Sequence, residues 1–330
     1  PLVSLVGGPV IFGNQQLGTT SGPATVSLTN LGGAPLTITN VALGGADPLD
    51  FTLTQTCPIN PTQLPQYGTC SDTITFTPMA VGTRTATLTF TDNNNAISGS
   101  TQTVTITGTS SAPTIGLSTG SVTFGPQPVT TTSPPMSFQI SNTGTAALNI
   151  TSIAINPTGE FAQTNNCIGL LAGGTNCTVI VTFTPSATGT RTASLIITDN
   201  SGGCPTCFVS QTVSLKGTGT DFSISVSPGS ETVSPGKVAL FTVTLTPSTS
   251  GFSGNVTLGC SVSPVVAGVT CTVPAGTVTL SGTAQKHVAV SIKPKKEKNP
   301  YTLTFSATYT ATPPSVGTLT HTTTAQVISK

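Results

Sequence analysis

The chain contains no tryptophan, only three tyrosines, and charged residues at only 6% of its positions. Soluble domains usually carry about 25% charged residues. A net charge of +1 lacks the basic excess of nucleic-acid-binding proteins, and the shortage of tryptophan and tyrosine weakens any model of sugar or base stacking. No apolar run approaches the roughly 18–20 residues that span a bilayer. We therefore predict no nucleic-acid partner and no membrane insertion.

Helical patterning is also missing, because no long window places apolar side chains at helical spacing. Hydrophobic residues still make up 36% of the chain, which argues against disorder. Short runs of valine, isoleucine, leucine and threonine alternate with glycine and proline, as in strands joined by turns. In Thr85–Thr91, apolar side chains at even positions alternate with threonine at odd ones, which predicts a strand with one buried face. The predicted fold class is all-β.

A long internal repeat organises the first two thirds of the chain. The segment "FTPMAVGTRTATLTFTDNNN" at Phe76–Asn95 matches "FTPSATGTRTASLIITDNSG" at Phe183–Gly202. "VIFG" at Val10–Gly13 likewise matches "VTFG" at Val122–Gly125. The period of roughly 110 residues suits an Ig-sized sandwich of about 100 residues. The repeat predicts two copies of one β-sandwich.

We predict three tandem Ig-like β-sandwich domains, covering residues 1–112, 113–220 and 221–330. The third lacks the repeated motifs and is assigned to a different Ig-like family. The joints at residues 108–113 and 217–222 are short, which predicts a semi-rigid string of domains rather than freely tethered modules. The chain begins at Pro1 without an initiator Met or a signal peptide, so we expect a processed or trimmed product.

The motifs "FGNQQLGTTS", "LTNLGGAPLTITNV" and "FTPMAVGTRTATLTFTDN", with their second-copy equivalents, resemble a known family. They are similar to the choice-of-anchor D repeats of bacterial secreted proteins, which are related to the ASH (Hydin-like) domains. The third domain resembles the Ig-like modules that often follow such repeats. The resemblance implies a β-sandwich, a secreted or surface location and no catalytic activity.

The eight cysteines are even in number and close together in pairs, as in proteins of oxidising compartments. Two pairs occupy equivalent places in the two copies, and a third pair lies in the last domain. Zinc sites would need further ligands, and both histidines lie in the third domain. We predict intradomain disulfides, each worth about 3 kcal/mol, between Cys57 and Cys70, Cys167 and Cys177, and Cys260 and Cys271.

The fourth pair, Cys204 and Cys207, forms a C-x-x-C sequence in the loop after "IITDN". The equivalent loop of the first copy, "NNNAISGS", has no cysteine. A redox dithiol normally sits at a helix N-terminus, where the thiol pKa is lowered, and no helix is predicted here. A local disulfide that closes a hairpin tip is favoured, with redox activity, a metal site or an intermolecular bond as the alternatives.

Two sets of basic residues are candidate contact sites. The only arginines occupy equivalent positions in the two copies and could bind an anion. We favour strand-edge residues whose stems cover apolar surface while their heads bond backbone carbonyls. A lysine run in the third domain could touch an acidic polysaccharide or lipid surface, although a solvated loop is favoured. The residues concerned are Arg84, Arg191, Lys293, Lys295, Lys296 and Lys298.

No chemistry-bearing constellation emerges. Asp92 and Asp199 could contribute to calcium binding, but such a site needs several clustered oxygens, and we favour a turn role. His287 and His321 lie in strand-like segments without a triad signature. We therefore predict no catalytic residue, no cofactor and no metal.

The combined predictions favour a non-catalytic extracellular structural protein, the protomer of a bacterial surface filament, sheath or stalk. Self-association would use sandwich contacts or strand exchange, with residues 1–13 and 320–330 as the terminal strands best placed to be lent. The alternative is an adhesin or accessory binding module that recognises a surface glycan or another cell-surface protein. Both place the chain outside the cell.

Overall fold

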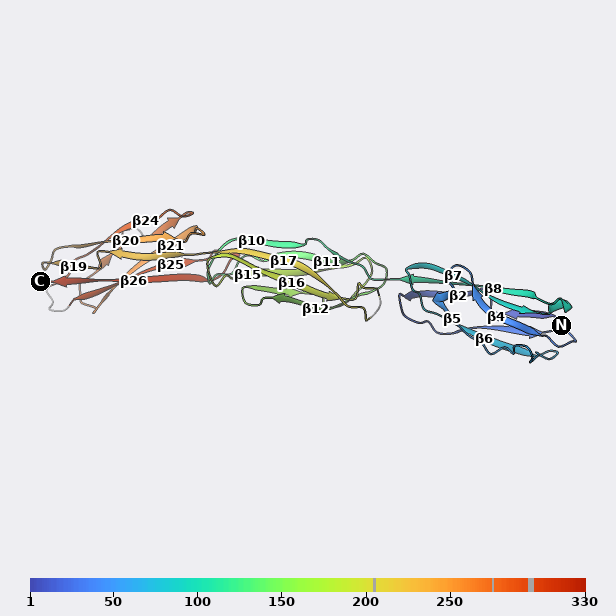
Figure 1. Ribbon diagram of the computed structural model, residues 1–330. Coiled ribbons are helices and arrows are strands. Elements are labelled where there is room, and N and C mark those ends of the chain that lie inside the picture. The colour runs from blue at the N-terminus through green and yellow to red at the C-terminus, as the bar shows by residue number, and fades with distance from the viewer. Residues whose placement is uncertain (204–205, 275, 296–299) are drawn as a thin grey trace.

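The computed structural model describes residues 1–203, 206–274, 276–295 and 300–330. Three β-sandwiches follow one another in a row, with the two termini at opposite ends (Figure 1). Within the described ranges the helical content is limited to two short 3-10 turns, η1 (Pro48–Asp50) and η2 (Asn94–Ala96). The predicted all-β fold of tandem Ig-like sandwiches is confirmed.

The first sandwich has two four-stranded sheets. The N-terminal segment changes sheet: its first strand pairs antiparallel with β3, and its second pairs parallel with β8. One sheet has the order β1 (Val3–Val6), β3 (Ala24–Asn30), β6 (Thr69–Phe76), β5 (Phe51–Thr54); the other has the order β2 (Val10–Gln16), β8 (Ser100–Ser111), β7 (Gly82–Asp92), β4 (Ile38–Gly44). The alternation predicted for Thr85–Thr91 is present in β7, where Ala86, Leu88 and Phe90 are buried.

The second sandwich repeats this topology with one added edge strand, β14. Its smaller sheet has the order β13 (Phe161–Asn165), β15 (Asn176–Phe183), β11 (Met136–Asn142), β9 (Ile115–Leu117). The larger has the order β10 (Ser121–Pro128), β17 (Val209–Thr220), β16 (Gly189–Asp199), β12 (Leu148–Asn156), β14 (Gly169–Leu171). Strands β10 and β17 again pair parallel.

The third sandwich also has a four- and a five-stranded sheet. The orders are β18 (Phe222–Ser227), β20 (Ala239–Pro247), β24 (Lys286–Ile292), β22 (Cys271–Thr272), and β19 (Ser230–Val233), β26 (Thr318–Ser329), β25 (Tyr301–Thr310), β21 (Gly254–Ser263), β23 (Thr277–Leu280). The last strand, β26, is paired on both sides, by β25 and β19. Residues 320–330 are therefore not a free edge, and Ala325 and Val327 are buried in this domain's own core. The exchange of this strand with another copy stays a prediction.

Each sandwich has its own hydrophobic core. In the first, the rings of Phe51 and Phe76 stack with centroids 4.9 Å apart, and Phe12 joins them. The second copy repeats this trio with Phe124, Phe161 and Phe183. A glycine of the last strand faces each trio: a Cβ on Gly108 would lie 2.6 Å from the Phe76 ring, and one on Gly217 would lie 2.4 Å from the Phe183 ring.

Three disulfides lie within the sandwiches. The bonds join cysteines separated by 13, 10 and 11 positions, and they are Cys57–Cys70, Cys167–Cys177 and Cys260–Cys271. Cys204 lies outside the described residues, so the predicted Cys204–Cys207 bond stays a prediction.

Because the cores are separate, losing one disulfide should destabilise one sandwich. We expect the double variant Cys57→Ala, Cys70→Ala to lower the stability of the first domain by about 3 kcal/mol. Differential scanning calorimetry should show one of the unfolding transitions moving to lower temperature. The matched variant Cys260→Ala, Cys271→Ala should move a different transition. A common shift of all transitions in both variants would contradict independent cores.

Candidate functional site

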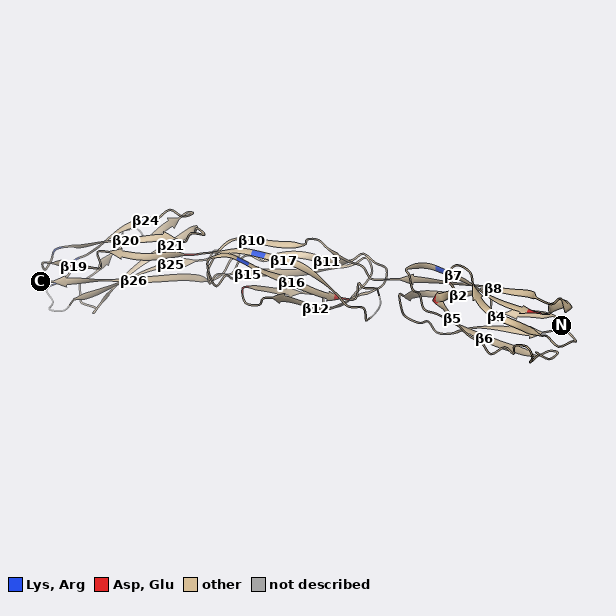
Figure 2. Ribbon diagram, viewed as in Figure 1, with Lys and Arg blue, Asp and Glu red and all other residues tan. Residues whose placement is uncertain are grey.

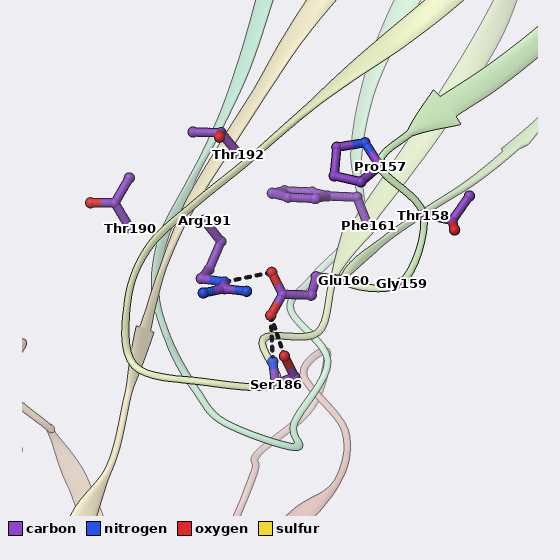
Figure 3. Close-up of a pocket in the computed structure, with 9 residues that line it drawn as sticks. All are labelled: Pro157, Thr158, Gly159, Glu160, Phe161, Ser186, Thr190, Arg191 and Thr192. Atoms are coloured by element: carbon purple, nitrogen blue, oxygen red, sulfur yellow. Dashed lines mark hydrogen bonds and ion pairs between the residues drawn. The ribbon is translucent and has the colours of Figure 1, made fainter.

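An arginine–carboxylate pair lies at the end of the second sandwich that faces the third. Glu160 immediately precedes β13, and Arg191 lies near the start of β16. The Nε of Arg191 donates to Oε2 of Glu160 over 2.6 Å, and the backbone N and hydroxyl of Ser186 donate to Oε1 over 2.8 and 2.5 Å (Figure 3). One carboxylate thus joins three segments of the domain.

The environment of Glu160 favours its charged form. Burial alone would raise the pKa of this carboxyl, but the hydrogen bonds from Arg191 and Ser186 outweigh burial, and the pKa is lowered from its ordinary value of 4.5. The site therefore holds a negative charge and a positive charge side by side at neutral pH.

A hollow of about 590 Å³ opens beside this pair. Figure 3 shows the guanidinium of Arg191 surrounded by the other lining residues. The exposed residues of its lining include three threonines and Ser186, whereas Phe161 is buried. The lining residues are Pro157, Thr158, Gly159, Glu160, Phe161, Ser186, Thr190, Arg191 and Thr192.

The first copy holds its arginine between two carboxylates. The Nε of Arg84 donates to Oδ2 of Asp50, and Nη2 lies 2.6 Å from Oδ1 of Asp47. The other oxygen of Asp47 accepts from the backbone N of Thr85 over 2.9 Å. The hydrogen bond to Asp50, with both nearby negative charges, raises the pKa of Arg84 against the opposing effect of burial. The guanidinium is permanently charged and is held in one orientation.

These contacts correct the prediction that the arginine heads bond backbone carbonyls. Both heads bind side-chain carboxylates, because an acidic residue directly precedes the first phenylalanine of β5 and β13. Sequence reasoning missed Asp50 and Glu160, as well as Asp47. The signal was present as "DF" at Asp50–Phe51 and "EF" at Glu160–Phe161, but the acid differs between copies and lies more than 30 positions from its arginine.

The lysine candidates do not join the arginines, because Arg84, Arg191 and the lysine run lie in three different sandwiches. Figure 2 shows how few charged residues the ribbon carries. Lys293 is exposed. The Nζ of Lys295 donates to the carbonyl of Ala267 in a neighbouring loop. The predicted contact residues Lys296 and Lys298 lie outside the described residues.

Asp92 and Asp199 hold turns. Oδ1 of Asp92 accepts from the backbone N of Asn94, and Oδ1 of Asp199 accepts from that of Ser201, each over 2.7 Å. Burial raises the pKa of Asp92. Among the residues that the structure describes, no group of three or more histidine, cysteine or acidic side chains is placed to hold a metal ion. The same ranges contain no helix long and apolar enough to cross a membrane.

The loops after β2 and β10 form a second duplicated feature. The Nε2 of Gln15 donates to the hydroxyl of Thr19 over 2.6 Å, and the Thr19 hydroxyl donates to the carbonyl of Gln16 over 2.7 Å. In the second copy, Gln127, Thr131 and Pro128 repeat both bonds at the same distances. Each loop presents one apolar residue at the same position, Leu17 in the first copy and Val129 in the second.

These two apolar residues contact the next domain. Val129 is 6% exposed and belongs to the core of the third sandwich. Beside it, the backbones of Thr132 and Val316 exchange two hydrogen bonds of 2.7 and 3.1 Å across the joint. At the other joint, Leu17 lies against the backbone of Gly203, where an added Cβ would be 2.8 Å from the Leu17 side chain. Gly203 belongs to the loop after β16.

No family model matches the chain, and no curated protein matches it. Among solved structures, it is similar to extracellular cadherin domains 1–4 of protocadherin gamma B7, with 13% identity over 97% of this chain and 74% of that chain and a TM-score of 0.35. A three-Ig segment of titin matches with 12% identity over 99% and 98% and a TM-score of 0.32. The human desmocollin-1 ectodomain matches with 13% identity over 97% and 60% and a TM-score of 0.36. The description of the fold therefore rests on the sheet topology.

The pair at Glu160 predicts a pH-dependent stability. Because the folded-state pKa is lowered, the stabilisation is present above the unfolded value near 4.5 and is lost as pH falls through the folded value. Glu160→Gln should cost about 1–2 kcal/mol at pH 7. Thermal melts of variant and parent should converge in acid. An equal difference at neutral and acidic pH would contradict this account of the ion pair.

Proposed function

We propose that this protein is a non-catalytic extracellular structural protein, the protomer of a surface filament, sheath or stalk. Its first two sandwiches are proposed to be choice-of-anchor D or ASH-type repeats, on the motifs that each copy shares. The observation that carries the structural role is the duplicated joint, because the same loop places Leu17 and Val129 against the following domain.

The joints favour a stiff rod over a flexible chain. At the second joint, a buried valine and two backbone hydrogen bonds cross between domains, and β18 begins two residues after β17 ends. Bending there would expose Val129 and break the bonds, which costs free energy. A rod that keeps its length suits an element that spaces or stacks subunits.

Composition and covalent bonds support a place outside the cell. Among the described residues there are three disulfides, and disulfides are typical of proteins in oxidising compartments. Each closes a short loop, and such crosslinks stabilise a domain mainly by restricting its unfolded chain.

Exposed sheet edges offer surfaces for self-association. Strand β2 is an edge strand of the first sandwich, and β14 is an edge strand of the second. Each carries an outward apolar side chain, Ile11 at 74% exposure and Leu170 at 77%. Natural edge strands are usually protected by charges or covered, so two uncharged edges with exposed aliphatic residues favour contacts between copies.

The alternative is an adhesin or accessory module that recognises a glycan or a protein. An aromatic platform is not present among the tyrosines: Tyr301 is buried, Tyr309 packs edge-on against Phe252, and only Tyr67 is largely exposed. The observation that favours the alternative is the hollow at Arg191.

Electron microscopy of the secreted protein at high concentration tests the assembly directly. We expect filaments or ordered arrays from the parent, and their loss in the double variant Ile11→Lys, Leu170→Lys, because lysine on an edge strand opposes pairing. Val265→Lys is the matched control, since Val265 is 92% exposed in a loop away from those edges. Dispersed monomers of the parent would count against the proposal.

The stiffness of the second joint has its own test. Val129→Ala should destabilise the third sandwich by about 2 kcal/mol, because it removes buried methyl groups from that core. Small-angle X-ray scattering should show a shorter maximum dimension as the joint bends. Leu31→Ala serves as the control, since Leu31 is exposed in the first sandwich. Unchanged stability and dimensions in Val129→Ala would contradict the proposal that Val129 stiffens the second joint.

A further inference from the structure

The two repeats have their arginines at equivalent positions, but the loop that precedes Phe51 is longer than the loop that precedes Phe161. Ten positions separate Val41 from Phe51 in the first copy, and eight separate the matching Ile153 from Phe161. The longer loop brings Asp47 to Nη2 of Arg84. Counting back from the phenylalanines, Pro157 stands where Asp47 stands. The second copy keeps one carboxylate on its arginine and lacks the other.

Arg191 lines the hollow. Its contact with Glu160 uses Nε, whereas Arg84 uses both Nε and Nη2 on two acids. Its side chain is 34% exposed, against 22% for Arg84. The hollow of about 590 Å³ falls in the size range of small-ligand sites. A planar pair of N–H donors matches the two oxygens of a carboxylate.

The charges around the hollow define the ligand further. Arg191 and Glu160 balance each other, and Lys216 lines a neighbouring hollow that shares Pro157 and Thr192 with this one. The two hollows together therefore carry one net positive charge, which suits a single carboxylate, whereas the second charge of a phosphate would be repelled by Glu160. Thr158, Thr190 and Thr192 line the hollow, and their hydroxyls can donate to or accept from a hydroxylated ligand.

We propose that this hollow is a binding site for a hydroxylated monocarboxylate, of the class of uronic-acid sugars and small hydroxy acids. Its carboxylate takes the place on Arg191 that Asp47 occupies on Arg84 in the first copy. Glu160 and Ser186 hold the guanidinium still, so the fork is oriented before the ligand arrives. The site is independent of the proposed filament contacts, because neither Ile11 nor Leu170 lines it.

The test is an NMR titration of the whole chain with galacturonate, glycolate and galactose as probes. Galacturonate should give saturable shifts at the amides of Gly159, Thr158 and Thr192 at concentrations up to about 50 mM. Galactose, which lacks the carboxylate, should leave these amides unchanged. Glycolate distinguishes the sources: equal affinity for glycolate identifies a small hydroxy acid as the ligand, and a tighter galacturonate complex identifies a sugar.

Three variants assign the effect to the arginine fork. Arg191→Lys keeps the charge but removes the planar fork, and it should weaken binding by about tenfold. Thr158→Asp supplies a carboxylate from the loop and should compete with the ligand. Asp47→Ala opens the fork of Arg84 and should create a second set of shifts near Thr85. Lys286→Gln, in the third sandwich, is the control and should bind like the parent.

The proposal is overturned if galacturonate and galactose shift the same amides equally. It is also overturned if no saturable shift is localised at the hollow, or if Arg191→Lys binds as tightly as the parent while its spectrum shows a folded protein. Filament formation can fail without affecting any of these readouts, so the two proposals are tested separately.

Discussion

The packing of three phenylalanine rings against a glycine organises one end of each repeat. The ring of Phe76 fills the space that a side chain on Gly108 would need, and Phe183 does the same at Gly217. The trio holds the two sheets together at that end. Two duplicated features adjoin these same phenylalanines. One is the arginine–carboxylate pair, and the other is the loop that carries the apolar joint residue.

The carboxylates are linked to the phenylalanine trio through the chain, and the joint loops are linked to it through hydrogen bonds. Asp50 and Glu160 directly precede the trio members Phe51 and Phe161. The backbones of Phe76 and Phe183 exchange hydrogen bonds with the serine in each joint loop, Ser21 in the first copy and Ser133 in the second. A single core arrangement therefore determines where the charged pair lies and where the next domain begins.

Duplication of this frame left room for divergence in the loops. In the first copy Arg84 contacts two carboxylates, whereas in the second copy Arg191 contacts one. One copy meets a glycine of the next repeat at Leu17, and the other inserts Val129 into the core of a differently patterned sandwich. Gly203, in the loop after β16, contacts Leu17 at the first joint.

The sequence by itself determined the strands, the repeat and the three disulfide pairings. These features depend on alternation, spacing and composition, which can be read directly from the order of residues. The "FTP" and "GTRT" motifs located equivalent strands without any contact information. Only the tertiary structure decided what the arginines bind, since Asp50 and Glu160 lie far from them in sequence and meet them only when the sheets close. It also decided that β26 lies inside a sheet, because a strand's neighbours depend on pairing between distant segments, which alternation alone does not encode.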